Sequence, residues 1–301
     1  MAPPVFWPTL FGLSFLAVGV ITYRRDLRTF APREAFGLVA FGPALVAAAL
    51  AAFAGEHFTA AAGLATLVPK WLPGRVFIAY LVGVAHFAAA SSFVARRCMR
   101  WSTIGLAVMF GLFALLMDLP ASIARPATPF PWMLAARQIT FSIGALALFA
   151  TATTRRSPQT ARMIATIARI WIGCVLVGYG LQHVVHPQYT PGVPSPVLTA
   201  AWVPLPVLIA TATGVLLIAF GLLMFVRRYA SAAAALCGLL MVLLTLALYV
   251  PDFFLAGNVQ QRVKAINFIF DTLLFGGTML VISKAISNAE SPALSGSSPA
   301  T

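Results

Sequence analysis

Long apolar runs separated by short polar connectors dominate the chain. Nine of these runs are long enough to cross about 30 Å of hydrocarbon, which takes about 20 helical residues. They cover residues 5–23, 37–55, 75–95, 101–119, 132–153, 168–184, 205–226, 232–250 and 265–283. The pattern therefore predicts an all-α integral membrane protein with nine transmembrane helices.

Positive residues gather in every second connector. Arg24, Arg25 and Arg28 follow the first run directly, and no positive residue precedes its apolar core, which is the reverse of a secretory signal peptide. With the N-terminus outside, fourteen Lys and Arg residues fall on the inner side and six on the outer side. The positive-inside rule then predicts a multi-pass protein of the inner (plasma) membrane with a cytoplasmic C-terminus.

The segment from Trp71 to Pro120 occurs twice. A shift of 131 positions pairs Trp71 with Trp202, Pro73 with Pro204, Gly83 with Gly214, Arg96-Arg97 with Arg227-Arg228, and Pro120 with Pro251. Four helices are an even number, so both copies enter the membrane from the same side and the predicted repeats are parallel. We expect an N-terminal helix with a basic connector (1–34), two four-helix repeats (35–154 and 155–286) and a disordered tail (287–301).

Composition agrees with a membrane protein, because 60% of the 301 residues are hydrophobic and 9% are charged, against about 25% charged in soluble domains. The net charge of +13 lies in short groups between apolar runs. Nucleic-acid binding needs positive residues gathered on one exposed face, so it is not expected, and the lipid bilayer is the main partner. The three cysteines show no paired or metal-ligand spacing, so neither a disulfide nor a metal site is expected.

Ionisable residues inside the predicted spans are the candidate functional residues, since they are costly in hydrocarbon and usually face a cavity or a partner. Glu56 and His57 end the second run, Asp118 ends the fourth, and His86 lies near the middle of the third. A site in the first repeat would combine these side chains.

Arg137 and Asp271 occupy comparable places in the fifth and ninth runs. A salt bridge between the two repeats would satisfy both charges. The alternative is that Arg137 extends to the outer interface while Asp271 bonds the backbone or a hydroxyl such as Thr272.

A second pair of histidines, His57 and His183, ends the first helix of each repeat. Gln182 precedes His183, and His186 follows three residues later. These imidazoles could handle protons or polarise a ligand at the outer face, or they could cap free carbonyls at a helix C-terminus. No third ligand beyond Asp252 is evident for a metal, so none is predicted.

The first repeat resembles the four-helix DoxX-like membrane family. The resemblance rests on Glu56-His57-Phe58, on Val68 to Pro73, on Gly83-Val84, on the basic turn Arg96-Arg97, and on Asp118 to Ser122. It covers residues 40–150 well and 168–283 more loosely. The chain departs from the family pattern where a glutamate of the second helix is replaced by His86 and Leu217, and where an asparagine is replaced by Ser122.

The resemblance implies two parallel DoxX-like four-helix repeats. Some DoxX-like proteins are membrane subunits of quinone-linked sulfur oxidation, some accompany thiol redox complexes, and related proteins act as assembly factors. One hypothesis is therefore a redox-associated subunit that binds a quinone or similar lipid-soluble molecule near the outer face, next to a membrane or periplasmic redox partner protein. The other is a non-catalytic scaffold, assembly factor or small-solute carrier.

The two hypotheses differ in the space they require. A quinone site needs an apolar cavity of several hundred cubic ångströms with a histidine exposed to it, whereas a scaffold has its polar residues bonded to each other in a filled bundle. The chain has no nucleotide-binding loop, nucleophile elbow or zinc-protease motif. Whether the protein is an enzyme is left open.

Overall fold

The computed structural model describes residues 2–29, 37–154 and 156–290. Within these ranges nine helices are long and apolar enough to span a membrane, which confirms the predicted all-α class. The main helices are α1 (Pro3–Tyr23), α2 (Gly42–Thr59), α4 (Arg75–Ala95), α5 (Met99–Phe113), α7 (Pro129–Thr153), α8 (Pro158–Val185), α9 (Pro206–Phe225), α10 (Arg227–Leu244) and α12 (Val259–Glu290).

Short elements extend or join these spans. Four spans, α1, α7, α8 and α9, begin at a proline, which suits a first helical turn because its missing N–H has no intrahelical partner there. The short elements are η1 (Asp26–Thr29), η2 (Gly37–Phe41), α3 (Ala61–Leu64), η3 (Ala114–Asp118), α6 (Leu119–Ala124), η4 (Thr245–Tyr249) and α11 (Val250–Leu255).

The fourth and eighth spans continue past the prolines at which the apolar runs were expected to end. Each contains a π-helical turn, η3 or η4, directly before its proline. In these turns the N–H of Leu119 reaches back to Ala114, and that of Val250 to Thr245. The wider turn changes the hydrogen-bond register just before Pro120 and Pro251, so the helix passes a residue that would otherwise break it.

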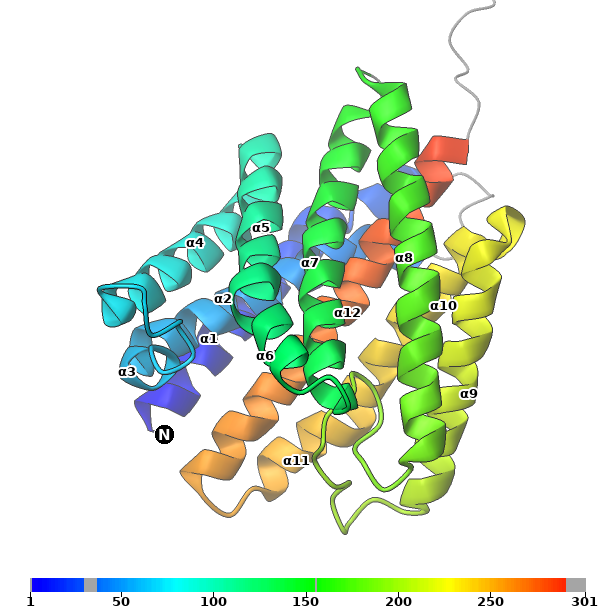
Figure 1. Cartoon of the computed structure of the whole chain (residues 1–301). Helices are drawn as coiled ribbons and strands as arrows, with labels where there is room; N and C mark the ends of the chain where they lie inside the picture. Colours follow the sequence, from blue (N-terminus) through cyan, green and yellow to red (C-terminus); the bar gives the residue numbers. More distant parts are fainter. Residues whose placement is uncertain (1, 30–36, 155, 291–301) are drawn as a thin grey trace, which may run out of the picture.

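Two helices, α7 and α12, form the centre of the bundle (Figure 1). They pack against each other, and α12 also packs against α2, α8 and α10, while α7 packs against α5 and α8. The helix α1 packs mainly on α2. The first four-helix group is α2, α4, α5 and α7, and the second is α8, α9, α10 and α12. The predicted N-terminal helix is therefore attached to the outside of the first group.

Alanine allows close packing around α2. The side chains from Ala47 to Ala52 are fully buried, and α1, α4 and α12 pack around this helix. Small residues let helix backbones approach closely in a membrane, where van der Waals contact replaces the hydrophobic effect as the main attraction. This explains why a helix without a polar face lies inside the bundle.

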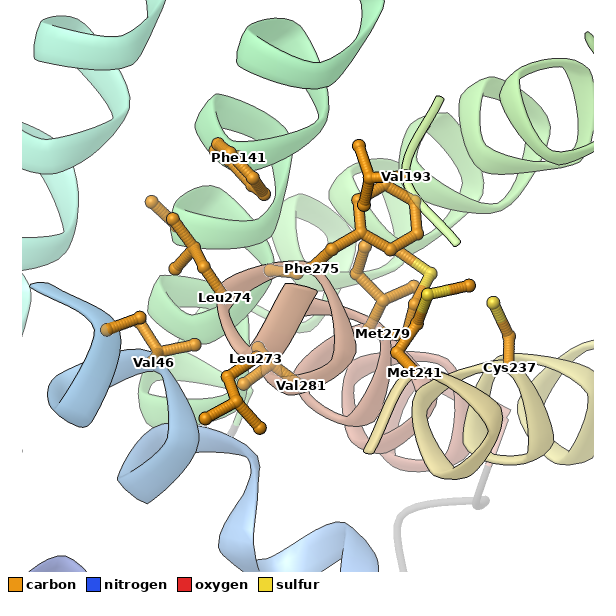
Figure 2. Close-up of a cluster of buried hydrophobic side chains, with 14 of the residues drawn as sticks. Val46, Phe141, Val193, Cys237, Met241, Leu273, Leu274, Phe275, Met279 and Val281 are labelled. Atoms are coloured by element: carbon orange, nitrogen blue, oxygen red, sulfur yellow. The ribbon is translucent and has the colours of Figure 1, made fainter. Parts of the chain in front are cut away.

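The main hydrophobic core surrounds α12. Figure 2 shows Phe141 from α7 and Met241 from α10 directed toward Phe275 and Met279 of α12. The rings of Phe141 and Phe275 are 6.4 Å apart between centroids. Val193 reaches the same cluster from the connector between α8 and α9, so this connector folds back onto the bundle.

The offset of 131 residues also relates several elements of the structure. It carries η3 onto η4, α6 onto α11, and the first residue of α4 onto the first residue of α9. Helix contacts correspond in the same way, because α2 packs on α4 as α8 packs on α9, and α5 packs on α7 as α10 packs on α12. Duplication would produce such correspondences, but the duplication itself stays a prediction.

A salt bridge joins η1, directly after α1, to the C-terminal end of α4. Arg96 Nη1 donates to Asp26 Oδ1 at 3.0 Å, and its guanidinium lies 4.9 Å from the ring centroid of Tyr23. The hydrogen bond to Asp26 raises the pKa of the Arg96 guanidinium above its usual value. The Tyr23 hydroxyl also donates to the Phe93 carbonyl. These contacts hold α1 and α4 together near the connector between α4 and α5.

The tail predicted to begin at residue 287 overlaps the end of α12. The helix α12 extends to Glu290, so residues 287–290 are helical. The chain from 291 to 301 lies outside the described residues, as do Arg33 and Arg155 of the predicted inner connectors.

Candidate functional site

A cavity of about 1030 Å³ lies among α4, α5, α7 and α12. Parts of α2 and the connectors α2–α4 and α8–α9 complete its wall, with Val193 to Ser195 on one side and, on another, Leu64, Leu67, Val68, Pro69 and Leu72. Most of the wall is apolar. The first four-helix group thus encloses most of the space, while α12 and one connector belong to the second.

His86 is a buried polar side chain in the wall of this cavity. It is 3% exposed, and neither ring nitrogen has a hydrogen-bond partner among the described residues. The rings of His57, Phe110 and Phe53 lie 5.2, 6.0 and 6.1 Å away between centroids. An unsatisfied buried polar group costs about 1–3 kcal/mol, so His86 is suited to bind a ligand.

His57 also lines the cavity, and its tautomer follows from one contact. Its Nδ1 lies 2.8 Å from the carbonyl oxygen of Phe53 one turn earlier in α2. A carbonyl only accepts, so Nδ1 carries the proton and Nε2 of the neutral ring is an acceptor. His57 therefore bonds a carbonyl inside α2 and not a free carbonyl of its last turn, and it borders the cavity.

Arg137 and Asp271 form the predicted salt bridge between α7 and α12. Arg137 Nη1 donates to Asp271 Oδ2 at 2.7 Å, which confirms the pairing. Both residues line the cavity, and the Nε of Arg137 has no partner among the described residues. One buried N–H of the guanidinium thus lacks a described partner beside a pair that is already neutral.

Glu56 and Asp118 lie close to this salt bridge. Glu56 is within electrostatic range of Asp271, and Asp118 of Arg137. Glu56 Oε1 and Asp118 Oδ2 are buried without a hydrogen-bond partner in the described part of the chain. The carboxyl groups of Asp271 and Asp118 therefore lie within electrostatic range of the guanidinium, and of the three carboxyl groups only Asp271 is among the cavity-lining residues.

The other three candidates, Gln182, His183 and His186, are not among the residues that line the cavity. His183 is 1% exposed, and its Nε2 lies 2.9 Å from the oxygen and 3.2 Å from the nitrogen of Gly192. His186 packs its ring near Tyr189 at 5.7 Å between centroids. His183 therefore holds the connector between α8 and α9.

Tyr249 holds the same connector from the other side, since its hydroxyl donates to the Pro191 carbonyl. Tyr249 and Leu217 are 131 positions after Asp118 and His86, and both are fully buried. Gly192 itself has φ +122°, which L side chains rarely adopt. In the second group His183 and Tyr249 therefore fix the backbone beside Val193. Val193 in turn closes part of the cavity wall.

Polar residues that the sequence analysis missed also border the cavity. Gln138 follows Arg137 directly and has its Oε1 buried without a described partner. Gln260, Lys264 and Asn267 line the cavity from the start of α12. A polar side chain next to an intramembrane arginine could have indicated Gln138. Gln260 and Lys264 precede the predicted ninth run, and Asn267 lies near its start.

Within the described residues, no group of three or more His, Cys, Asp or Glu side chains is placed to hold a metal ion. No protein-family model matches the chain, and no curated protein or solved structure is similar enough to count as a match. Function must therefore be inferred from the cavity and its residues.

Proposed function

We propose that the protein binds a quinone, or a similar lipid-soluble molecule with a small polar head, in the cavity of the first four-helix group. We also propose that the chain consists of two parallel DoxX-like repeats. The unpartnered ring of His86 in an apolar cavity carries the proposal. Ligand sites are mostly apolar cavities with a few polar groups, with volumes of about 300–1,000 Å³.

The polar groups match the two redox forms of a quinone. A quinone carbonyl accepts a hydrogen bond, which the free N–H at Nε of Arg137 can donate. A quinol hydroxyl donates one, which Nε2 of His57 can accept. His86 offers one donor and one acceptor when neutral, so it can bind either form.

The protein's role in this proposal is to hold and orient the quinone for a membrane or periplasmic redox partner. Reduction of a quinone takes two electrons and two protons, and the partner supplies the electrons. The family resemblance supports this redox association. A scaffold, assembly factor or small-solute carrier is the alternative outcome, and the open cavity with unpartnered polar atoms does not favour a bundle filled for structure alone.

Lipid extraction tests the proposal. The full chain is purified from its native membrane in mild detergent, and the extracted lipids are analysed by mass spectrometry. We expect the wild-type protein to retain a quinone. We expect His86→Leu to reduce quinone affinity about tenfold, which corresponds to one hydrogen bond of about 1.4 kcal/mol. Leu217 occupies the corresponding position in the second group, so the substitution should not prevent folding.

His186→Ala is the matched control, because His186 is half-buried and does not line the cavity. It should retain as much quinone as the wild type. His86→Leu should also raise thermal stability, since it removes a buried polar group that has no partner. Equal quinone content in all three proteins, or none in the wild type, would contradict the proposal.

A further inference from the structure

Small residues line the cavity where α4 and α5 face each other. Ala85, Ala88 and Ala89 line it from α4, and Gly105 lines it from α5. A Cβ atom added at Gly105 would have no other atom within 4 Å, apart from the neighbouring chain of its own helix. The space beside Gly105 is therefore open.

This part of the cavity wall also faces the outside of the bundle at apolar residues. Leu81, Val108 and Leu112 line the cavity, yet 54%, 55% and 45% of their surfaces are exposed. A residue that is both cavity-lining and exposed marks an opening. In a membrane span the exposed side of such residues contacts lipid, so the opening faces the bilayer.

The arrangement of the two helices explains the opening. In Figure 1, α4 and α5 meet at their short connector, and α4 then inclines away from α5. Gly83 instead allows α4 to pack closely against α2, because a Cβ at this position would lie only 2.7 Å from the Cβ of His57. The helix α4 is thus held against α2 and leaves a gap toward α5 that the cavity occupies.

The second four-helix group carries larger side chains at three of the four corresponding positions, while Ala88 corresponds to another alanine, Ala219. Leu216, Phe220 and Leu236 lie 131 positions after Ala85, Ala89 and Gly105. Replacing alanine or glycine by leucine or phenylalanine fills space that a ligand would otherwise occupy. The small residues are therefore a property of the first group and not of the helix pair as such.

Building on the proposed function, we propose that the ligand is a long-tailed membrane lipid that enters sideways from the bilayer between α4 and α5. Its polar head lies against His86, Arg137 and Asp271, and its apolar tail occupies the opening beside Gly105. The volume supports a tail, since a cavity of about 1030 Å³ is at the upper limit for drug-sized ligands and a single-ring head would leave most of it empty. Because a tail in the bilayer is already out of water, its attraction to the opening comes from van der Waals contact with the wall.

The test uses the full chain in lipid nanodiscs and two quinone probes with the same head, one with a ten-carbon tail and one without a tail. After correction for the partition of each probe into empty nanodiscs, we expect the wild type to bind the tailed probe about tenfold more tightly. Gly105→Trp fills the opening, so it should weaken the tailed probe by about tenfold and leave the tail-less probe within about twofold. Gly105→Leu, which copies Leu236, should have a smaller effect in the same direction.

Gly178→Trp is the matched control. Gly178 lies in α8, has equally open space and does not line the cavity, so both probes should bind as they do to the wild type. An unchanged affinity for the tailed probe in Gly105→Trp would overturn the lateral opening and favour entry beside Lys264 and Gln260. Equal weakening of both probes would overturn the placement of the tail. Failure of the wild type to bind either probe would instead contradict the proposed quinone site.

Discussion

At the scale of single residues, the molecule concentrates its buried charges at one place. Arg137 is paired with Asp271 at 2.7 Å, while Glu56 and Asp118 each keep a buried carboxyl oxygen without a described partner. Buried ion pairs are weak evidence of stability, because desolvation offsets much of their attraction. Groups without partners raise the free energy of the empty site further, as expected where a ligand or a proton later binds.

The salt bridge gives a prediction about stability. Arg137→Met leaves Asp271 as an uncompensated buried charge, so the free energy of unfolding should fall by about 3–5 kcal/mol. The double variant Arg137→Met with Asp271→Leu removes both charges and should recover much of this loss. Thermal unfolding of the two single variants, the double variant and the wild type in one detergent measures the coupling. Additive losses would show that the two side chains do not stabilise each other.

At the scale of elements, glycine sets the distance between paired helices. A Cβ at Gly83 would lie 2.7 Å from the Cβ of His57, and one at Gly214 would lie 3.1 Å from the Cβ of His183. The two glycines are 131 positions apart, and each lies beside the histidine that ends the preceding span. The same packing therefore positions one histidine at a cavity and the other at a connector.

Gly83→Val should separate α4 from α2 and destabilise the protein by about 1–3 kcal/mol, because the added side chain overlaps His57 and Phe58. Gly105→Ala is the control, since it has open space and replaces a poor helix former; it should stabilise by about 0.5–1 kcal/mol. Unfolding temperatures in detergent distinguish the two. A neutral Gly83→Val would mean that α4 is free to shift without loss of packing.

The helices could be predicted from the sequence because an apolar run of span length has few alternatives in lipid. The ends of the fourth and eighth spans could not, since the passage of the chain through Pro120 and Pro251 depends on π-helical turns that the apolar pattern does not reveal. For the site, opposite charges in comparable spans indicated the pairing of Arg137 with Asp271. His183 resembles His57 in sequence, but only the folded connector shows that it bonds Gly192.

At the scale of the whole molecule, the two four-helix groups combine similar helix contacts with different contents. The first has small residues around a cavity. The second has Tyr249 and Leu217 buried at the positions that correspond to Asp118 and His86 of the first. The second group contributes α12 and the connector near Val193 to the cavity wall. We therefore expect the second group to complete the site rather than to contain another.

The predicted orientation has a direct test at Cys98, which is exposed in the connector between α4 and α5. With the N-terminus outside, this connector is cytoplasmic, so a membrane-impermeant maleimide should label Cys98 only after permeabilisation. Thr66→Cys in a Cys98→Ser background should be labelled in intact cells, because exposed Thr66 follows α3 in the predicted outer connector. The reverse labelling would show that the protein has the opposite orientation in the membrane. Because Leu64 and Leu67 line the cavity on either side of Thr66, it would also place this end of the cavity on the cytoplasmic side and exclude a periplasmic redox partner.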